Sequence, residues 1–236
     1  CGICGGSGIP EDECDCNGNV KDCDDVCGGD AMIDECGVCG GPGAVYCGGG
    51  ISECNEVDCP DTIDYCLELH SGANLISFYG LPEDASVSNI MSSIYGITKG
   101  VIGEGVATSY NDELGQWIGS LSIFSAYSGY WVTVSEPSEF CINDAIPTDP
   151  TIEYNLNLGA NLISFPSEGS IDISSGLPDD IESYVTGIIG EGVAANYNAQ
   201  LGWIGSLSAF SGGSGYWLIT SEAISFSFNL GSLVRT

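Results

Sequence analysis

Cysteines are concentrated at one end of the chain: 12 of the 13 lie at or before Cys66, about one in every five or six residues. Such a density is typical of segments that disulfides hold in order. Residues 1 to about 65 are also rich in glycine and aspartate and have almost no hydrophobic periodicity. Their order must therefore come from disulfides, Asn and Asp turns and any bound metal ions. Because so many disulfides need an oxidising compartment, we expect an extracellular protein.

The rest of the chain contains an internal repeat. Gly72–Phe78 (GANLISF) recurs as Gly159–Phe165, an offset of 159 − 72 = 87 residues, and Ser128–Trp131 (SGYW) recurs as Ser214–Trp217. A period this long favours two small homologous domains, each with its own core, over a solenoid. The predicted domains are a disulfide-rich segment (1–65), a first β-module (66–143), a linker (144–151) and a second β-module (152–236).

Short apolar runs within each module predict strands. In the first module, Leu67 and Leu69 alternate with polar residues, and Leu75–Phe78 and Tyr130–Val134 are further strand candidates. A short helix is predicted near Ser86–Ile94 with Ser86 as its N-cap, and its counterpart is predicted near Pro178. The predicted fold is mainly β: an irregular disulfide-rich segment followed by two small barrel or sandwich modules, each with one short helix.

The charge of the chain excludes several classes of partner. Three Lys and Arg residues oppose 33 Asp and Glu residues, so the net charge is −30. This charge repels phosphate backbones and anionic lipids, and we expect no nucleic-acid binding. The sequence has no apolar run of about 20 residues, which argues against direct membrane insertion. The chain begins at Cys1 within a cysteine repeat, so we expect a piece of a longer protein, with lipidation of Cys1 as the alternative.

Comparison of the two modules predicts one disulfide. Cys66 and Cys141 align with Glu153 and Ser227 in the second module, so both cysteines are missing there together. Joint absence is expected if the two cysteines are bonded to each other. This leaves 13 − 2 = 11 cysteines, so one of them must be free, lipidated or bonded outside the chain. The Cys-x-x-Cys spacings at 1–4 and 36–39 suit a zinc site as well, but the crowding of cysteines favours disulfides.

Oxygen side chains in the disulfide-rich segment suggest a cation site. Asp15, Asn17 and Asn19 alternate around Gly18, and Asp22 follows. Calcium loops use oxygen ligands in a similar alternation, although this segment matches an EF-hand loop only in part. The sequence therefore predicts calcium as a cofactor, bound by Asp15, Asn17, Asn19 and Asp22. The alternative is a solvated acidic surface in which Asp and Asn form turns.

Adjacent aromatic residues recur in both modules and leave two interpretations open. Tyr130 and Trp131 recur as Tyr216 and Trp217. They fill the cores of the modules, or one of each pair is exposed as a binding platform, because neighbours on a strand face opposite ways. Catalysis has little support, since His70 is the only histidine and aligns with Asn157.

Two sets of residues resemble known families. Asp34–Gly41 (DECGVCGG), preceded by Cys27–Ala31, resembles the cysteine- and glycine-rich repeats of large secreted proteins of marine bacteria and some marine viruses. The GANLISF and SGYW segments resemble a β-module that accompanies those repeats in cell-surface proteins. These resemblances imply surface display, adhesion or fibre building, at a cell surface or a virion surface, and they carry over no catalytic residue.

The leading hypothesis is an extracellular structural protein, a subunit or segment of a surface filament, stalk or virion appendage. Its partners would be copies of itself, with the disulfide-rich segment docked onto a β-module of a neighbouring copy. The alternative is a carbohydrate-binding adhesin module that binds surface glycans. A hydrolase is the third class considered.

Overall fold

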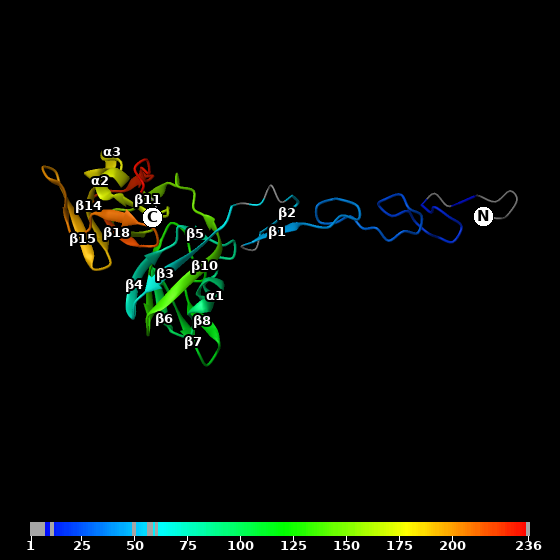
Figure 1. Cartoon of the computed structure of the whole chain (residues 1–236), viewed down its shortest axis with the longest axis horizontal. Coiled ribbons are helices and arrows are strands. Elements are labelled where there is room, and N and C mark those ends of the chain that lie inside the picture. Colours follow the sequence, from blue (N-terminus) through cyan, green and yellow to red (C-terminus); the bar gives the residue numbers. More distant parts are fainter. Residues whose placement is uncertain (1–7, 10–11, 49–50, 56–58, 60, 235–236) are drawn as a thin grey trace. The chain divides into compact units, whose positions relative to one another are not determined.

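The computed structural model describes residues 8–9, 12–48, 51–55, 59 and 61–234, and the chain divides into two compact units, residues 1–60 and 61–236 (Figure 1). The fold is mainly β, as the sequence predicts. The second unit starts a little before the predicted boundary because its first strand begins at Ile63. Within the described residues, no helix is long and apolar enough to cross a membrane.

The first unit consists mainly of loops and turns. Among its described residues, the regular structure is one antiparallel hairpin of β1 (Val45–Gly48) and β2 (Ile51–Glu53). The chain before the hairpin forms turns, with isolated bridges between Lys21 and Cys27 and between Ile33 and Cys39. The large apolar side chains that the structure describes between Ile9 and Val45 are exposed, Met32 at 79 %. The first unit therefore gains little stability from apolar burial.

The first module of the second unit contains two sheets. A five-stranded antiparallel sheet has the order β4-β9-β6-β7-β8, and a three-stranded sheet has the order β3-β10-β5. The elements are β3 (Ile63–Leu69), β4 (Gly72–Ser77), β5 (Gly80–Leu81), α1 (Val87–Ile90), the 3-10 helix η2 (Met91–Ser93), β6 (Thr98–Gly103), β7 (Val106–Asn111), β8 (Gln116–Gly119), β9 (Gly129–Val134) and β10 (Ser138–Pro147).

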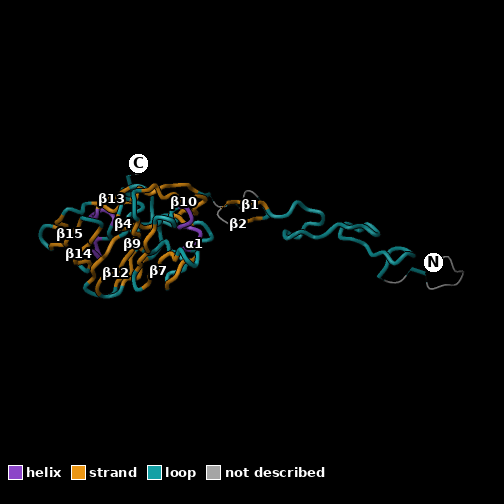
Figure 2. The backbone as a smooth tube through the Cα atoms, turned by 90° about the horizontal axis from the view of Figure 1, so that it is seen from below, coloured by secondary structure: helices purple, strands orange, loops and turns teal. Residues whose placement is uncertain are grey.

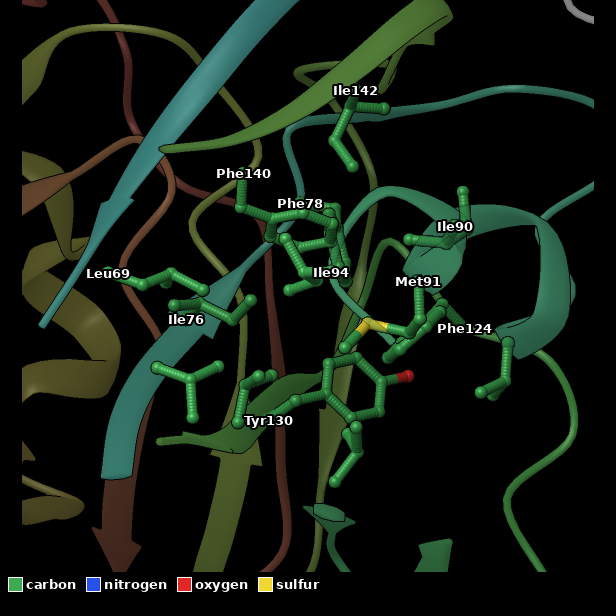
Figure 3. Packing of buried hydrophobic residues seen from close by; sticks show 14 of the residues in the cluster. Leu69, Ile76, Phe78, Ile90, Met91, Ile94, Phe124, Tyr130, Phe140 and Ile142 are labelled. Carbon is green, nitrogen blue, oxygen red and sulfur yellow. The ribbon is translucent and has the colours of Figure 1, made fainter. Parts of the chain in front are cut away.

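Aromatic and aliphatic side chains from both sheets and the helix form the core of the first module (Figure 3). Phe78 lies at its centre with no exposed surface, and its ring contacts Phe124, Tyr130 and Phe140 at centroid distances of 5.0–6.3 Å. Burial of such side chains stabilises a fold by about 2–3 kcal/mol each. The core is the main source of stability in this module.

The predicted helix of the first module is present. Ser86 caps α1 through its hydroxyl, which accepts a hydrogen bond from the backbone N–H of Asn89 at 3.3 Å. Val87 and Ile90 are buried, so the helical spacing of apolar residues does mark the core face.

The second module also has a five-stranded sheet, and it has one helix more than the sequence predicts. Its five-stranded sheet has the order β12-β18-β14-β15-β16, and two short pairs, β11-β19 and β13-β17, accompany it. Figure 2 labels β12, β13, β14 and β15 of this module on the backbone tube. The module carries two one-turn helices where the sequence predicts one, and Pro178 is the N-cap of the second helix. The elements are β11 (Tyr154–Leu156), β12 (Gly159–Ile163), β13 (Ser170–Asp172), α2 (Ile173–Gly176), α3 (Asp179–Glu182), β14 (Val185–Gly190), β15 (Val193–Asn198), β16 (Gly202–Gly205), β17 (Ala209–Ser211), β18 (Tyr216–Thr220) and β19 (Ile224–Phe226).

The segment predicted as a linker, residues 144–151, is in part a strand. β10 continues to Pro147, whose neighbour Ile146 pairs with Leu81 of β5. A bulge between Ile142 and Ala145 redirects the strand, and Asp144 adopts a positive φ of 51° there. The two prolines of this segment, Pro147 and Pro150, suggested a linker. Pro147 is nevertheless compatible with a strand because it is the last residue of β10.

Candidate functional site

The predicted disulfide of the first module is present. Cys66 and Cys141 lie directly opposite each other on β3 and β10, and their sulfur atoms are bonded at 2.04 Å. The described cysteines of the first unit are also disulfide-bonded. Cys36 and Cys39 therefore cannot form the zinc site considered above. Cys1, Cys4 and the side chain of Cys47 lie outside the described residues, and so does the predicted unpaired cysteine.

Two loops of the first unit are copies of each other, 12 residues apart. The carboxylate of Asp22 accepts hydrogen bonds from the backbone N–H groups of residues 24, 26 and 31 at 2.8–3.2 Å. The carboxylate of Asp34 accepts from residues 36, 38 and 43 at 2.8–3.0 Å. The bond from Val26 lowers the pKa of Asp22 most, and the bond from Val38 does so for Asp34. Each Asp thus holds one loop in place of an apolar core.

The Cys-Gly-Gly steps of the sequence follow from this geometry. A Cβ atom on Gly29 would lie 2.0 Å from a carboxylate oxygen of Asp22, and one on Gly41 would lie 2.1 Å from that of Asp34. The preceding glycine, Gly28, has a φ of +71°, a backbone conformation that residues other than glycine rarely adopt. Both glycines of the step are therefore required by the Asp-centred loop.

Disulfides join each loop to its neighbours. Cys14 is bonded to Cys27, Cys23 to Cys39, and Cys36 to Cys54, so the three closed loops overlap along the chain. Each bonded pair has a Cα–Cα distance of 5.5 Å, within the ordinary range. Each closed loop therefore shares a stretch of backbone with the next, and the three bonds form a continuous covalent path from Cys14 to Cys54.

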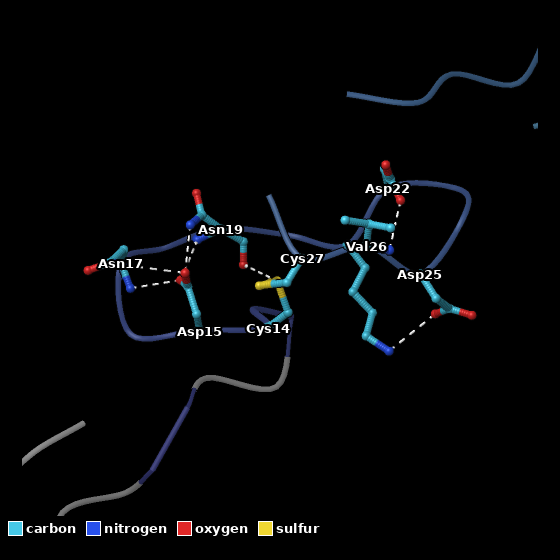
Figure 4. The surroundings of a disulfide bond; sticks show 9 residues. Cys14, Asp15, Asn17, Asn19, Asp22, Asp25, Val26 and Cys27 are labelled. Atoms are coloured by element: carbon cyan, nitrogen blue, oxygen red, sulfur yellow. Dashed lines mark hydrogen bonds and ion pairs between the residues drawn. A yellow bond between two sulfur atoms is a disulfide. The ribbon is translucent and has the colours of Figure 1, made fainter. Parts of the chain in front are cut away.

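The predicted calcium ligands lie in these same turns (Figure 4). The Asp15 carboxylate accepts hydrogen bonds from the backbone N–H groups of Asn17 and Asn19 and from both of their side-chain amides, at 2.6–3.4 Å. These bonds, that from the Asn17 backbone first, lower the pKa of Asp15. Asp22 belongs to the next loop. The arrangement matches the turn-forming alternative, and calcium binding remains a prediction.

In the second unit, the two modules complete each other's exposed strands. β4 and β12 are edge strands of their five-stranded sheets. The backbone N–H of Ser77 in β4 donates to the carbonyl of Gly213 in the second module at 2.8 Å, and that of Ser164, just after β12, donates to the carbonyl of Tyr127 in the first at 3.1 Å. The contact is reciprocal, like the interface of a two-fold symmetric dimer. It covers edges that would otherwise invite pairing with other chains.

One glutamate from each module binds the edge strand of the other. A carboxylate oxygen of Glu191 accepts a hydrogen bond from the backbone N–H of Leu75 at 2.7 Å. Glu104, its counterpart 87 residues earlier, accepts from the backbone N–H of Leu162 at the same distance. Glu104 and Glu191 are therefore structural residues of the interface between the modules. Both glutamates lie in a segment, Ile-Gly-Glu-Gly-Val-Ala, that occurs at 102–107 and again at 189–194, but the repeat does not reveal their hydrogen-bond partners.

Two glycines allow the close approach of the modules. A Cβ atom on Gly129 would lie 2.9 Å from the carbonyl oxygen of Ile163, and one on Gly215 would lie 2.7 Å from that of Ile76. Both glycines belong to the repeated Ser-Gly-Tyr-Trp segment. This explains why a glycine stands at this place in each copy.

His70 takes part in this interface on one side only. Its Nε2 is paired with the second carboxylate oxygen of Glu191, and this hydrogen bond is the main cause of a raised His70 pKa. His70 itself is exposed. The aligned residue in the second module is Asn157, so the pairing has no symmetric counterpart.

The predicted aromatic platform needs correction at two of its four residues. Tyr130 and Tyr216 are each 3 % exposed, and their hydroxyl oxygens accept hydrogen bonds from the backbone N–H groups of Ser125 and Ser211. They are core residues because their strands turn this face toward the helices. Trp131 and Trp217 are half-buried on the opposite face of the sheets.

Comparisons with known proteins leave the structure as the main guide to function. No protein-family model matches the chain, and no curated protein or solved structure shows significant similarity to it.

Proposed function

We propose that the chain is a structural segment of an extracellular surface assembly, such as a filament, stalk or virion appendage. In this proposal, the first unit resists stretching and the second unit is a stable paired body. The role requires no reaction, and the partners would be neighbouring copies of the chain or similar segments.

The overlapping disulfides carry this proposal. The backbone between Cys14 and Cys54 spans 54 − 14 = 40 residues, about 140 Å when extended. The disulfides offer a shorter covalent path through the bonds 14–27, 23–39 and 36–54. This path includes only the short backbone stretches between Cys23 and Cys27 and between Cys36 and Cys39, so it extends to about 40 Å. Tension would therefore act on covalent bonds instead of on weak loops.

The paired modules support the same role. One edge strand of each five-stranded sheet, β4 or β12, contacts the other module, and Cys66–Cys141 closes a 75-residue loop in the first module. Covering these two edges lowers the risk of strand pairing between copies at high local concentration. This suits a component that is present many times in one assembly.

Single-molecule stretching of the full chain, held at its two ends, tests the mechanical proposal. Under oxidising conditions we expect residues 14–54 to add no more than about 40 Å of length, and reductant should release about 100 Å more. Replacing Cys36 and Cys54 by Ser should release about 35 Å without reductant, which assigns the step to this segment. If the oxidised segment extends fully at low force, the proposed role is wrong.

Location is tested separately on native material. Gold-labelled antibodies against the second unit should decorate surface filaments or appendages at regular spacing in electron micrographs. Labelling that is confined to the cell interior, or to monomers released into the medium, would contradict the proposal.

A further inference from the structure

An open aromatic pocket lies on the first module, away from the interface between the modules. It has a volume of about 540 Å³, within the range of small-molecule sites. Three aromatic residues line it: Tyr95 follows η2, Tyr110 is in β7 and Trp117 is in β8. The rings are in contact in series, with centroid distances of 4.9 Å for Tyr95–Tyr110 and 5.5 Å for Tyr110–Trp117.

The corresponding place in the second module differs in one of its three aromatic residues. Tyr197 and Trp203 keep the second ring pair at 5.4 Å, but Glu182 stands where the first module has Tyr95. The Glu182 carboxylate accepts a hydrogen bond from the indole N–H of Trp203 at 2.8 Å. The indole N–H of Trp117 has no such partner among the described residues, and Tyr95 is 48 % exposed. In the second module, Glu182 thus takes the place of one ring of the pocket and binds the indole of another.

A second difference between the copies lies beside the pocket. The hydroxyl of Thr108 is buried and has no hydrogen-bond partner in the described part of the chain. Thr108 is two residues from Tyr110 on β7, so both side chains lie on the same face, and it pairs with Gly119, which lines the pocket. Its counterpart in the second module is Ala195. The unpartnered hydroxyl of Thr108 therefore has no equivalent in the second module, where Ala195 carries no polar side-chain group.

The lining selects an uncharged ligand with many hydroxyl groups. The chain has 33 acidic residues, yet none of the described residues that line this pocket is charged. Beside the rings, the lining offers hydroxyl and amide groups, including those of Ser88, Gln116 and Ser122. Aromatic faces stack on the apolar faces of sugar rings, while hydroxyl and amide groups bind their edges. A cationic ligand would find no carboxylate to pair with among the lining residues. An anionic ligand would be repelled by the net negative charge of the chain.

We propose that the pocket of Tyr95, Tyr110 and Trp117 binds a neutral saccharide chain, and that the second module has lost this site through Glu182. This goes beyond the proposed structural role and does not depend on it. The assembly would thereby bind uncharged glycans through one module of each chain.

The two modules supply matched variants for the test. Calorimetric titration of the full oxidised chain would use four probes: hexasaccharides of β-1,4-glucose, β-1,3-glucose and β-1,4-mannose, and a lysine hexapeptide. We expect at least one hexasaccharide to bind at one site per chain and the peptide not to bind. Tyr95→Glu and Trp117→Ala should each weaken binding at least about tenfold. Trp203→Ala should leave the affinity unchanged, and Glu182→Tyr should raise the number of sites from one to two.

Several outcomes overturn the proposal. These are the absence of binding by all three hexasaccharides, binding of the lysine peptide alone, or loss of binding in Trp203→Ala but not in Trp117→Ala. Tyr95 is exposed, so Tyr95→Glu tests the site even if Trp117→Ala fails to fold. A near-ultraviolet circular dichroism spectrum of each variant shows whether its fold is intact.

Discussion

The two units of the chain use acidic side chains for the same purpose but obtain their order from different sources. In the first unit, Asp22 and Asp34 bind backbone N–H groups within loops that disulfides join. In the second unit, Glu104 and Glu191 bind backbone N–H groups across an interface between two apolar cores. The comparison teaches that part of the large negative charge is structural. A carboxylate satisfies several backbone donors at once where no strand is available to do so.

Reduction should separate the two units most clearly. With a phosphine reductant present, residues 12–55 should lose their protection against hydrogen exchange, because their described apolar side chains form no core. Residues 61–234 should keep theirs, since both cores remain buried. Hydrogen-exchange mass spectrometry measures both regions in one sample. Protection that persists in residues 12–55 after complete reduction would show that another interaction orders them.

Removal of the disulfide of the first module should have the next largest effect. Replacing Cys66 and Cys141 by Ala frees a 75-residue loop in the unfolded chain, which lowers the free energy of unfolding by up to about 4–5 kcal/mol. The melting temperature should fall by about 10 °C or more. Differential scanning calorimetry measures both quantities.

The second module provides the complementary change. Introducing Glu153→Cys and Ser227→Cys creates the aligned pair, and the new bond should raise the melting temperature of that module. If Cys66→Ala with Cys141→Ala leaves the melting temperature unchanged, the Cys66–Cys141 bond contributes little to the stability of the second unit.

Loss of the interface glutamates should have a smaller effect. Glu104→Ala or Glu191→Ala leaves one edge N–H without its acceptor and should lower the free energy of unfolding by about 1 kcal/mol each. Glu136→Ala is the control, because this glutamate also recurs in the second module, as Glu222, and is exposed. Chemical denaturation of the three variants tests the assignment. Equal losses for all three would remove the special role of Glu104 and Glu191.

The smallest expected effect concerns the pairing of His70 with Glu191, which has no counterpart in the second module. The hydrogen bond from Glu191 raises the pKa of His70, so this pairing stabilises the fold fully below the unfolded pKa near 6.5. The contribution is lost as the pH rises through the folded pKa. His70→Asn, which introduces the residue of the second module, should therefore reduce stability at pH 5.5 but not at pH 9. A loss of equal size at both pH values would contradict the pairing.

The fold was predictable where local pattern or comparison of the two copies carried the information. Alternation marked β3, the hydroxyl of Ser86 marked the start of α1, and the joint absence of two cysteines marked the bond of Cys66 with Cys141. The linker was predicted too long, because proline content does not show that β10 continues past a bulge.

The candidate sites were less predictable, since their residues meet only in the folded chain. The sequence showed that Glu104 and Glu191 are kept in both copies, but their acceptor role depends on edge strands more than 50 residues away. It likewise showed that Tyr130 and Trp131 face opposite sides of a strand without showing which side is the core.

The sequence by itself determined the cross-linked first unit, the tandem modules and their β class, because cysteine spacing, repetition and periodicity are properties of the chain. Only the tertiary structure decided which side chains are buried, how the modules cover each other's edge strands β4 and β12, and that Glu182 binds the indole of Trp203 in the second module. The physical reason is that burial and hydrogen-bond partners depend on which distant segments pack together. Two nearly identical stretches of sequence can therefore present different surfaces.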